Sequence, residues 1–147
     1  MGTEVILRDL KNTAHGQAFI LGNGPSLLGQ MASLRSLVDR PTFCCNQMHR
    51  WAERPFQPTF YACSFAAIVE DGLEPEEPPY ERHKFLVSRF AQRLPGWVYV
   101  CKNGHAPFLW DEQASTLERD GERVLQVRNG YSQPFTMVQI AVWMGYR

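Results

Sequence analysis

The sequence lacks an excess of charge of either sign. Fifteen Lys and Arg residues balance fifteen Asp and Glu residues in a chain of 147, so the formal net charge at pH 7 is zero. A protein that coats nucleic acid or an anionic membrane by bulk electrostatics needs a large excess of positive charge. We therefore expect no nucleic-acid partner. A small anionic ligand held by a few well-placed dipoles is compatible with this composition.

Long apolar runs and metal-type cysteine spacings are also missing. No apolar stretch reaches the ~20 residues that a membrane helix needs, and the start, MGTEVILRDL, does not have the pattern of a secretory signal. The four cysteines form no C-x-x-C pair, which zinc sites usually contain. They lie in apolar, β-like runs, where a free thiol behaves as a small hydrophobic group. We expect a cytoplasmic protein, in a reducing compartment, with no transmembrane segment.

Signatures of bound metals and cofactors are absent as well. No D-x-D occurs, although a hard divalent cation on a donor pyrophosphate usually requires closely spaced carboxylates. Neither G-x-G-x-x-G nor G-K-[ST] is present. The carboxylate pairs Glu70–Asp71 and Asp111–Glu112 are expected to be solvated surface. These absences predict no metal site and no tightly bound cofactor.

The residues that are present suit one globular domain spanning residues 1–147. Hydrophobic residues make up 44% of the chain and charged residues 20%, which is ordinary globular usage. Short, unalternated apolar runs predict strands that are buried on both faces, as in parallel sheets; they span residues 18–21, 42–45, 59–62, 97–100 and 124–127. Helices are expected at residues 33–38, 64–71, 80–94 and 133–144, and an exposed loop at 71–79. The alternation predicts an α/β fold, a Rossmann-like three-layer domain with a mostly parallel sheet.

The sequence Gly22-Asn23-Gly24-Pro25-Ser26 follows the first predicted strand directly. A strand, a glycine-rich turn and a helix in this order point backbone N–H groups at an anion. Proline suits the first position of a helix, so Gly24 would be its cap. The same residues also suit a plain turn with no ligand, and both interpretations remain open.

Three further polar turns follow other predicted strands. Asn46 and Gln47 follow the second strand, Ser64 follows the third, and the segment 129–132 follows the fifth, next to Gln133. Each could simply cap a turn or a helix. The carboxyl ends of parallel strands share one rim of a sheet, where ligands of open α/β sheets bind. Together the four turns predict a cleft for a nucleotide or a nucleotide sugar.

Several of these motifs together resemble a known family. FILGNGPSL, CNQ and PTFYACSF resemble the nucleotide-binding half of the bacterial lipooligosaccharide α-2,3/α-2,8-sialyltransferases, and the ending QIAVWMGYR is similar to a late helix of that fold. The GNGPS turn also resembles the broader group related to archaeal 6-hydroxymethylpterin pyrophosphokinase, which includes proposed flagellin glycosyltransferases. The resemblance covers three patches of the chain.

The sialyltransferase resemblance implies a domain that binds CMP-sialic acid and acts on a glycan or glycolipid acceptor. It places the following residues around the donor: Gly22, Asn23, Gly24, Ser26, Asn46, Gln47, Ser64, Ser132 and Gln133. Ser64 stands where those enzymes carry Asn. A donor with a single phosphate needs no metal, whereas the pyrophosphokinase alternative implies ATP and Mg²⁺.

The resemblance leaves the catalytic residues unassigned. It implies that the general-base His and the assisting tyrosines come from segments beyond the matched residues. We therefore expect a fragment of a longer protein, truncated at the C-terminus, that binds better than it catalyses. His105 is nearest to the predicted rim and is interpreted as a loop residue, and His83 is expected on a solvated helix face. A third alternative is a non-catalytic nucleotide-binding or interaction module, whose unpaired edge strand would make it a homo-oligomer.

Overall fold

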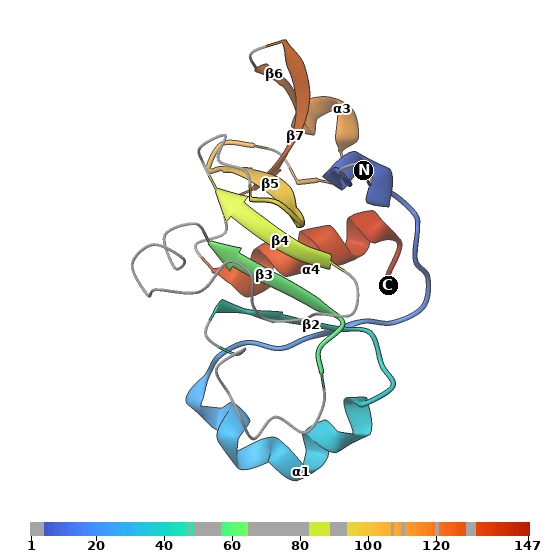
Figure 1. Cartoon of the computed structure of the whole chain (residues 1–147), viewed down its shortest axis with the longest axis vertical. Helices are drawn as coiled ribbons and strands as arrows, with labels where there is room; N and C mark the ends of the chain where they lie inside the picture. Colours follow the sequence, from blue (N-terminus) through green and yellow to red (C-terminus); the bar gives the residue numbers. More distant parts are fainter. Residues whose placement is uncertain are drawn as a thin grey trace.

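The computed structural model describes residues 5–46, 48, 57–64, 83–88, 94–106, 108–109, 111–119, 121–128 and 132–147. It shows an α/β fold with a seven-stranded sheet in the order β1-β2-β3-β4-β5-β7-β6 (Figure 1). All pairs are parallel except β6 with β7. The strands are β1 (Phe19–Ile20), β2 (Thr42–Cys45), β3 (Phe60–Ser64), β4 (His83–Ser88), β5 (Trp97–Asn103), β6 (Thr116–Arg119) and β7 (Glu122–Arg128). The predicted Rossmann-like class is confirmed.

The helical elements are short, with one exception. The 3-10 helices are η1 (Leu7–Leu10), η2 (Pro25–Gln30) and η3 (Arg35–Leu37), and the α-helices are α1 (Met31–Leu34), α3 (Glu112–Ser115) and α4 (Gln133–Met144). The segments η2, α1 and η3 follow one another without a break and form the crossover from β1 to β2. The helix predicted at 33–38 is therefore part of a longer, mostly 3-10 segment.

The helix predicted at 80–94 is wrong for its described part. Residues 83–88 form β4, which pairs in parallel with both β3 and β5. Apolar residues at 85, 86, 90 and 94 had suggested one face of a helix. Phe85, Leu86 and Val87 are instead consecutive and almost completely buried, because neighbours cover both faces of a central strand.

Two other predictions fall partly outside the described residues. Ser64 is the last residue of β3 and pairs with Val87. The rest of the helix predicted at 64–71, and the loop predicted at 71–79, lie outside the part that the structure describes.

The antiparallel strand β6 was not predicted. It forms a hairpin with β7.

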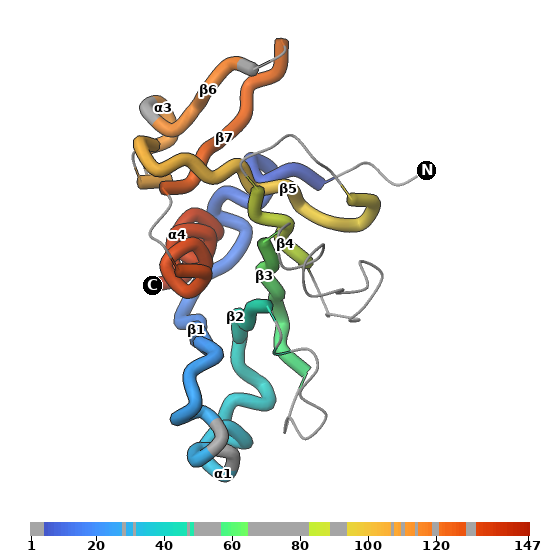
Figure 2. Tube along the Cα trace, turned by 90° about the vertical axis from the view of Figure 1, so that its left-hand side faces the viewer, coloured from blue at the N-terminus to red at the C-terminus, as the bar shows by residue number. Residues whose placement is uncertain are grey.

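The helix α4 has the bounds predicted from the sequence and lies on one side of β2 and β3 (Figure 2). It also contacts β1 and β7. Pro134 lies in its first turn, where no intrahelical N–H is needed. Gly145 ends it with φ of 110°, a left-handed conformation that favours glycine.

Two apolar clusters separate three layers. The cluster on the α4 side includes Met137, Ile140 and the stacked rings of Phe43 and Phe60, whose centroids are 4.4 Å apart. The other cluster includes Cys44, Tyr61 and Leu86 from the sheet with Leu34 from the crossover. Neighbouring residues of one strand, such as Cys44 and Cys45, enter opposite clusters, as the strand period of two requires.

The strands β1 and β6 are the two edges of the sheet. Phe19 on β1 is 37% exposed, and self-association through this edge stays a prediction. Within the described ranges, no helix has both the length and the apolar character that crossing a bilayer demands. All four cysteines are buried, which agrees with their interpretation as small hydrophobic residues.

Candidate functional site

The glycine turn is held against the carboxyl end of β2. Leu21 N–H donates to the carbonyl of Phe43 over 2.8 Å, so the chain stays beside β2 after β1 has ended. The Nδ2 of Asn23 then donates to the carbonyl of Cys45 over 2.9 Å. This bond spans 22 residues of sequence and places Asn23 beside the residue that precedes Asn46. The first two predicted turns therefore meet at one rim.

The side chain of Asn23 supports the glycine turn. Its amide N–H binds the backbone of β2 and positions the turn. The backbone N–H groups of Gly22, Asn23 and Gly24 donate no hydrogen bond within the described residues. The turn thus presents main-chain donors, with the Asn23 side chain as their support.

The first turn of α4 contacts the same place. A Cβ added to Gly22 would lie 3.7 Å from Cγ of Pro134. Ser132 and Gln133 directly precede Pro134, so the start of α4 comes near the glycine turn in space. Ser132 is the N-cap residue, its side chain makes no capping bond, and the first turn contains no acidic residue. The partial positive charge of this helix end is therefore not offset by a neighbouring carboxylate of its own first turn.

Two further candidates lie at the carboxyl ends of the next strands. Asn46 has φ of 50°, a conformation that asparagine tolerates better than most residues, and its carbonyl accepts a hydrogen bond from the Tyr61 hydroxyl. Ser64 is half-buried at the end of β3, and its carbonyl accepts a bond from the Cys63 thiol over 3.3 Å. Gln47 lies outside the described residues.

An open groove of about 530 Å³ begins at the glycine turn. It lies between β1 and the crossover, and its lining residues are Ile20, Leu21, Gly22, Gly24, Ser26, Leu27, Gln30, Ser33, Leu34, Ser36 and Leu37. The sequence predicted the glycine turn and Ser26 as site residues, but not the residues of the crossover that line the groove. The spacing of Ser26, Gln30 and Ser33 at i, i+4 and i+7 was a signal that one helical face carries these polar groups.

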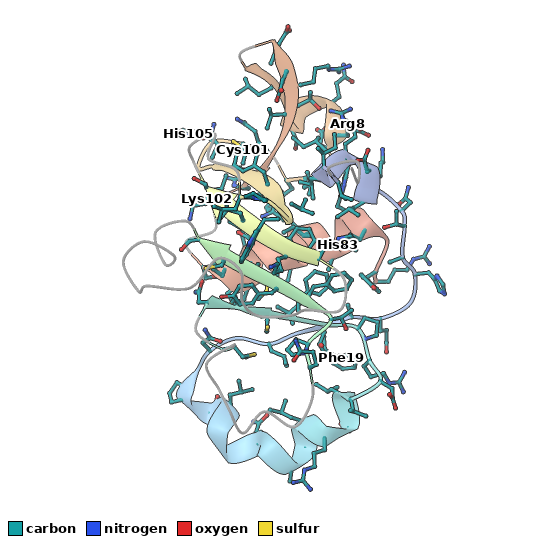
Figure 3. All side chains as sticks on the ribbon, viewed as in Figure 1. Arg8, Phe19, His83, Cys101, Lys102 and His105 are labelled. Atoms are coloured by element: carbon teal, nitrogen blue, oxygen red, sulfur yellow. The ribbon has the colours of Figure 1, made fainter. Side chains whose placement is uncertain are left out.

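The two histidines considered from the sequence lie at opposite ends of the neighbouring strands β4 and β5 (Figure 3). His105 is exposed after β5, and its backbone N–H donates to Oδ1 of Asn103 over 3.0 Å. This agrees with its interpretation as a loop residue. His83 is not on a helix: it begins β4, is half-buried, and stacks on Phe60 with ring centroids 6.2 Å apart.

The carboxylate Glu112 belongs to a different part of the molecule. It forms ion pairs with Lys11 and with Arg8, at 3.3 Å for the latter, beside η1 and the β6–β7 hairpin (Figure 1). The hydrogen bond from Lys11 is the main cause that lowers the pKa of Glu112. Within the described ranges, no three His, Cys, Asp or Glu side chains are grouped as metal ligands would be.

Burial also controls the thiol chemistry next to the rim. Burial, and to a smaller extent the neighbouring Cys63, raises the pKa of Cys45 to about 11. The thiol is therefore protonated at neutral pH, and Cys45 contributes its carbonyl rather than a nucleophile.

Comparison of the chain with protein-family models, with curated proteins and with solved structures gave no match. The functional argument accordingly depends on the geometry of the rim.

Proposed function

We propose that the rim binds the phosphate of a nucleotide sugar and that the chain is a donor-binding domain of glycosyltransferase type. The observation that carries this proposal is the bond from Asn23 to the Cys45 carbonyl. It gathers the main-chain donors of the glycine turn, the end of β2 and, through Gly22, the first turn of α4. A β-strand, a glycine turn and a helix N-terminus form a common anion-binding arrangement.

A donor with one phosphate is favoured over a donor with a pyrophosphate. Around the glycine turn and the end of β2, the described groups are backbone N–H groups, amides and hydroxyls, which are neutral donors. A pyrophosphate carries more charge and is usually matched by a metal ion or by several cations. CMP-sialic acid, which the sequence resemblance implies, has a single phosphate. We therefore propose a CMP-linked sugar as the donor.

Calorimetric titration with CMP, UDP and ATP–Mg²⁺ tests the proposal. We expect CMP to bind more tightly than UDP and ATP–Mg²⁺. Tighter binding of ATP–Mg²⁺ would instead support the pyrophosphokinase alternative. If none of the three binds, the rim is not a nucleotide site, and an interaction module becomes the better description.

The variant Asn23→Ala tests the role of the glycine turn. Loss of its single hydrogen bond should lower stability by about 0.5–1.5 kcal/mol and weaken CMP binding at least roughly tenfold, since the turn loses its support. The matched control is Thr13→Ala, which removes the bond from Thr13 Oγ1 to the Leu10 carbonyl, 2.8 Å long, away from the rim. An equal loss of CMP affinity in both variants would contradict a specific role for Asn23.

A further inference from the structure

The groove beside β1 has the dimensions and the polarity of a small-molecule site. Its volume of about 530 Å³ falls within the roughly 300–1,000 Å³ typical of such sites. One end is formed by Gly22 and Gly24, where the proposed phosphate binds, and the other reaches Leu37 at the end of the crossover. A molecule with its phosphate at the turn would therefore extend along β1.

The lining residues combine an apolar floor with a polar lip. Four aliphatic side chains form the floor: Leu21, Leu27, Leu34 and Leu37. Ile20 also borders the groove, but its side chain packs against the α4-side cluster. The lip contains Ser26, Gln30, Ser33 and Ser36, and none of the lining residues that the structure describes is charged.

The polar side chains of the lip differ in whether they are engaged. The hydroxyl of Ser36 donates to the Ser33 carbonyl over 2.7 Å. The side chains of Ser26, Gln30 and Ser33 make no hydrogen bond to other described residues. These three can therefore donate to a ligand and accept from it.

We infer that this groove binds the uncharged nucleoside half of the nucleotide, an inference that rests on the proposed function. The flat face of a base suits the aliphatic floor, and ribose hydroxyls suit the three free polar side chains. An isoprenoid chain on a phosphate would match the floor but would leave Ser26, Gln30 and Ser33 without partners when it covers them, which costs free energy. A charged body would find no counter-ion in this lining.

The experiment separates the two halves of the ligand. Amide spectra are titrated with orthophosphate, cytidine, CMP and geranyl phosphate, for the unmodified protein and for Ser33→Phe. Ser33 lines the groove and is exposed on α1, so the added ring should take up groove volume without disturbing the core. We expect CMP to bind more tightly than orthophosphate or cytidine alone. In Ser33→Phe, CMP affinity should fall at least roughly tenfold, to the level of orthophosphate, whose own affinity should not change.

The control is Gln113→Phe, which places the same ring on α3, where Gln113 is exposed. It should leave all affinities unchanged. If Ser33→Phe lowers the urea midpoint, Gln30→Ala removes one polar contact without adding volume and should still weaken CMP severalfold.

Three results would overturn the inference. Unchanged CMP binding in Ser33→Phe would place the nucleoside elsewhere and leave the proposed phosphate site standing. Tighter binding of geranyl phosphate than of CMP would assign the groove to a lipid chain. If neither orthophosphate nor CMP binds the unmodified protein, the proposed function itself fails, and the inference fails with it.

Discussion

On the α4 side of the sheet, Met137, Ile140 and Phe43 are completely buried, whereas in the corner formed by β1 and its crossover Leu27 and Leu37 stay half-buried above an open groove. Both regions are rich in aliphatic residues. The first uses them to exclude water, and the second leaves part of its apolar surface accessible. The stability of the fold is therefore concentrated on the α4 side, and the corner is where we propose that a ligand binds.

The two regions meet where α4 begins. A Cβ added to Gly22 would lie at van der Waals distance from the ring of Pro134. The rest of α4 contacts strands and the N-terminal segment, and its end is bonded to residues that precede β1, as in the 2.8 Å bond from Ala14 N–H to the Met144 carbonyl. Changes at the end of α4 should therefore alter folding without altering ligand affinity in the folded protein.

The largest effect is expected for Gly145→Ala. Gly145 has φ of 110°, and a Cβ there would lie 2.3 Å from the carbonyl oxygen of Ala14. Backbone strain and this clash, with backbone rather than with a movable side chain, should lower the free energy of unfolding by about 3–5 kcal/mol. Urea denaturation measures the loss.

The matched control is Gly29→Ala in η2. No atom lies within 4 Å of the added Cβ there, so the change should stay within about 0.5 kcal/mol. Equal losses in the two variants would show that the end of α4 is not held as tightly as the packing indicates. CMP affinity, measured where each protein is folded, should be unchanged in both.

The next effect is expected for Gln139→Leu. Gln139 is 1% exposed, accepts from Arg128 N–H over 3.0 Å and donates to the Arg128 carbonyl over 2.9 Å. Leucine keeps the volume and leaves both backbone groups unpaired, so stability should fall by about 2–3 kcal/mol. Thermal unfolding checks this, with Gln113→Leu on the exposed face of α3 as the control. If Gln139→Leu lost less stability than the control, water would be replacing the Gln139 amide as the hydrogen-bond partner of the Arg128 backbone.

The contrast between the two regions also explains what the sequence could predict. The bounds of β2 and α4 were predicted to the residue, because local signals define them: an apolar run before Asn46, a proline in the first turn and a glycine at the end. The strand β4 was missed because the apolar residues at 85, 86, 90 and 94 follow the spacing of a helix face, while Phe85, Leu86 and Val87 also suit a buried strand. Only pairing with β3 and β5 decides between the two.

The site was predictable to the same extent. The glycine turn is a local signal, and its position at the rim follows from any parallel sheet. The bond of Asn23 to Cys45 joins residues that are 22 positions apart, and the groove depends on how the crossover packs against β1. Neither follows from a pattern within one segment.

The third prediction concerns alkaline pH and the α4-side residue that also supports the corner. The pKa of Cys45 rises from 9.0 to about 11 on folding. Between these values the unfolded chain loses the proton while the folded protein keeps it, so stability present below pH 9 falls as pH rises toward 11. In Cys45→Ala this part of the fall, about 1–3 kcal/mol, should disappear. Urea midpoints at pH 8 to 11 measure it.

A core variant that keeps the thiol serves as the control for that series. Val87→Ala removes buried volume from the same cluster and should lower stability by a similar amount at every pH. If Cys45→Ala and Val87→Ala show the same dependence on pH, the thiol of Cys45 does not govern the alkaline loss.

The smallest effect is expected at Glu112, which belongs to neither region. Its pKa is lowered in the folded protein, first by the hydrogen bond from Lys11 and then by the charges of Lys11, Arg8 and Arg123. The unfolded chain therefore takes up the proton first, so the stabilisation is present above the ordinary value of 4.5 and is lost as pH falls through the folded value. In Glu112→Gln, the acid unfolding midpoint should move by only a few tenths of a pH unit, roughly, because the pair is exposed and screened. Circular dichroism at pH 2 to 6 measures this shift.

An equal midpoint in 0.5 M salt for both proteins is the expected control result, since salt screens surface pairs. If Glu112→Gln changed the affinity for CMP at pH 7, the region around Glu112 would be energetically coupled to the corner formed by β1 and its crossover, and the two could not be treated as independent.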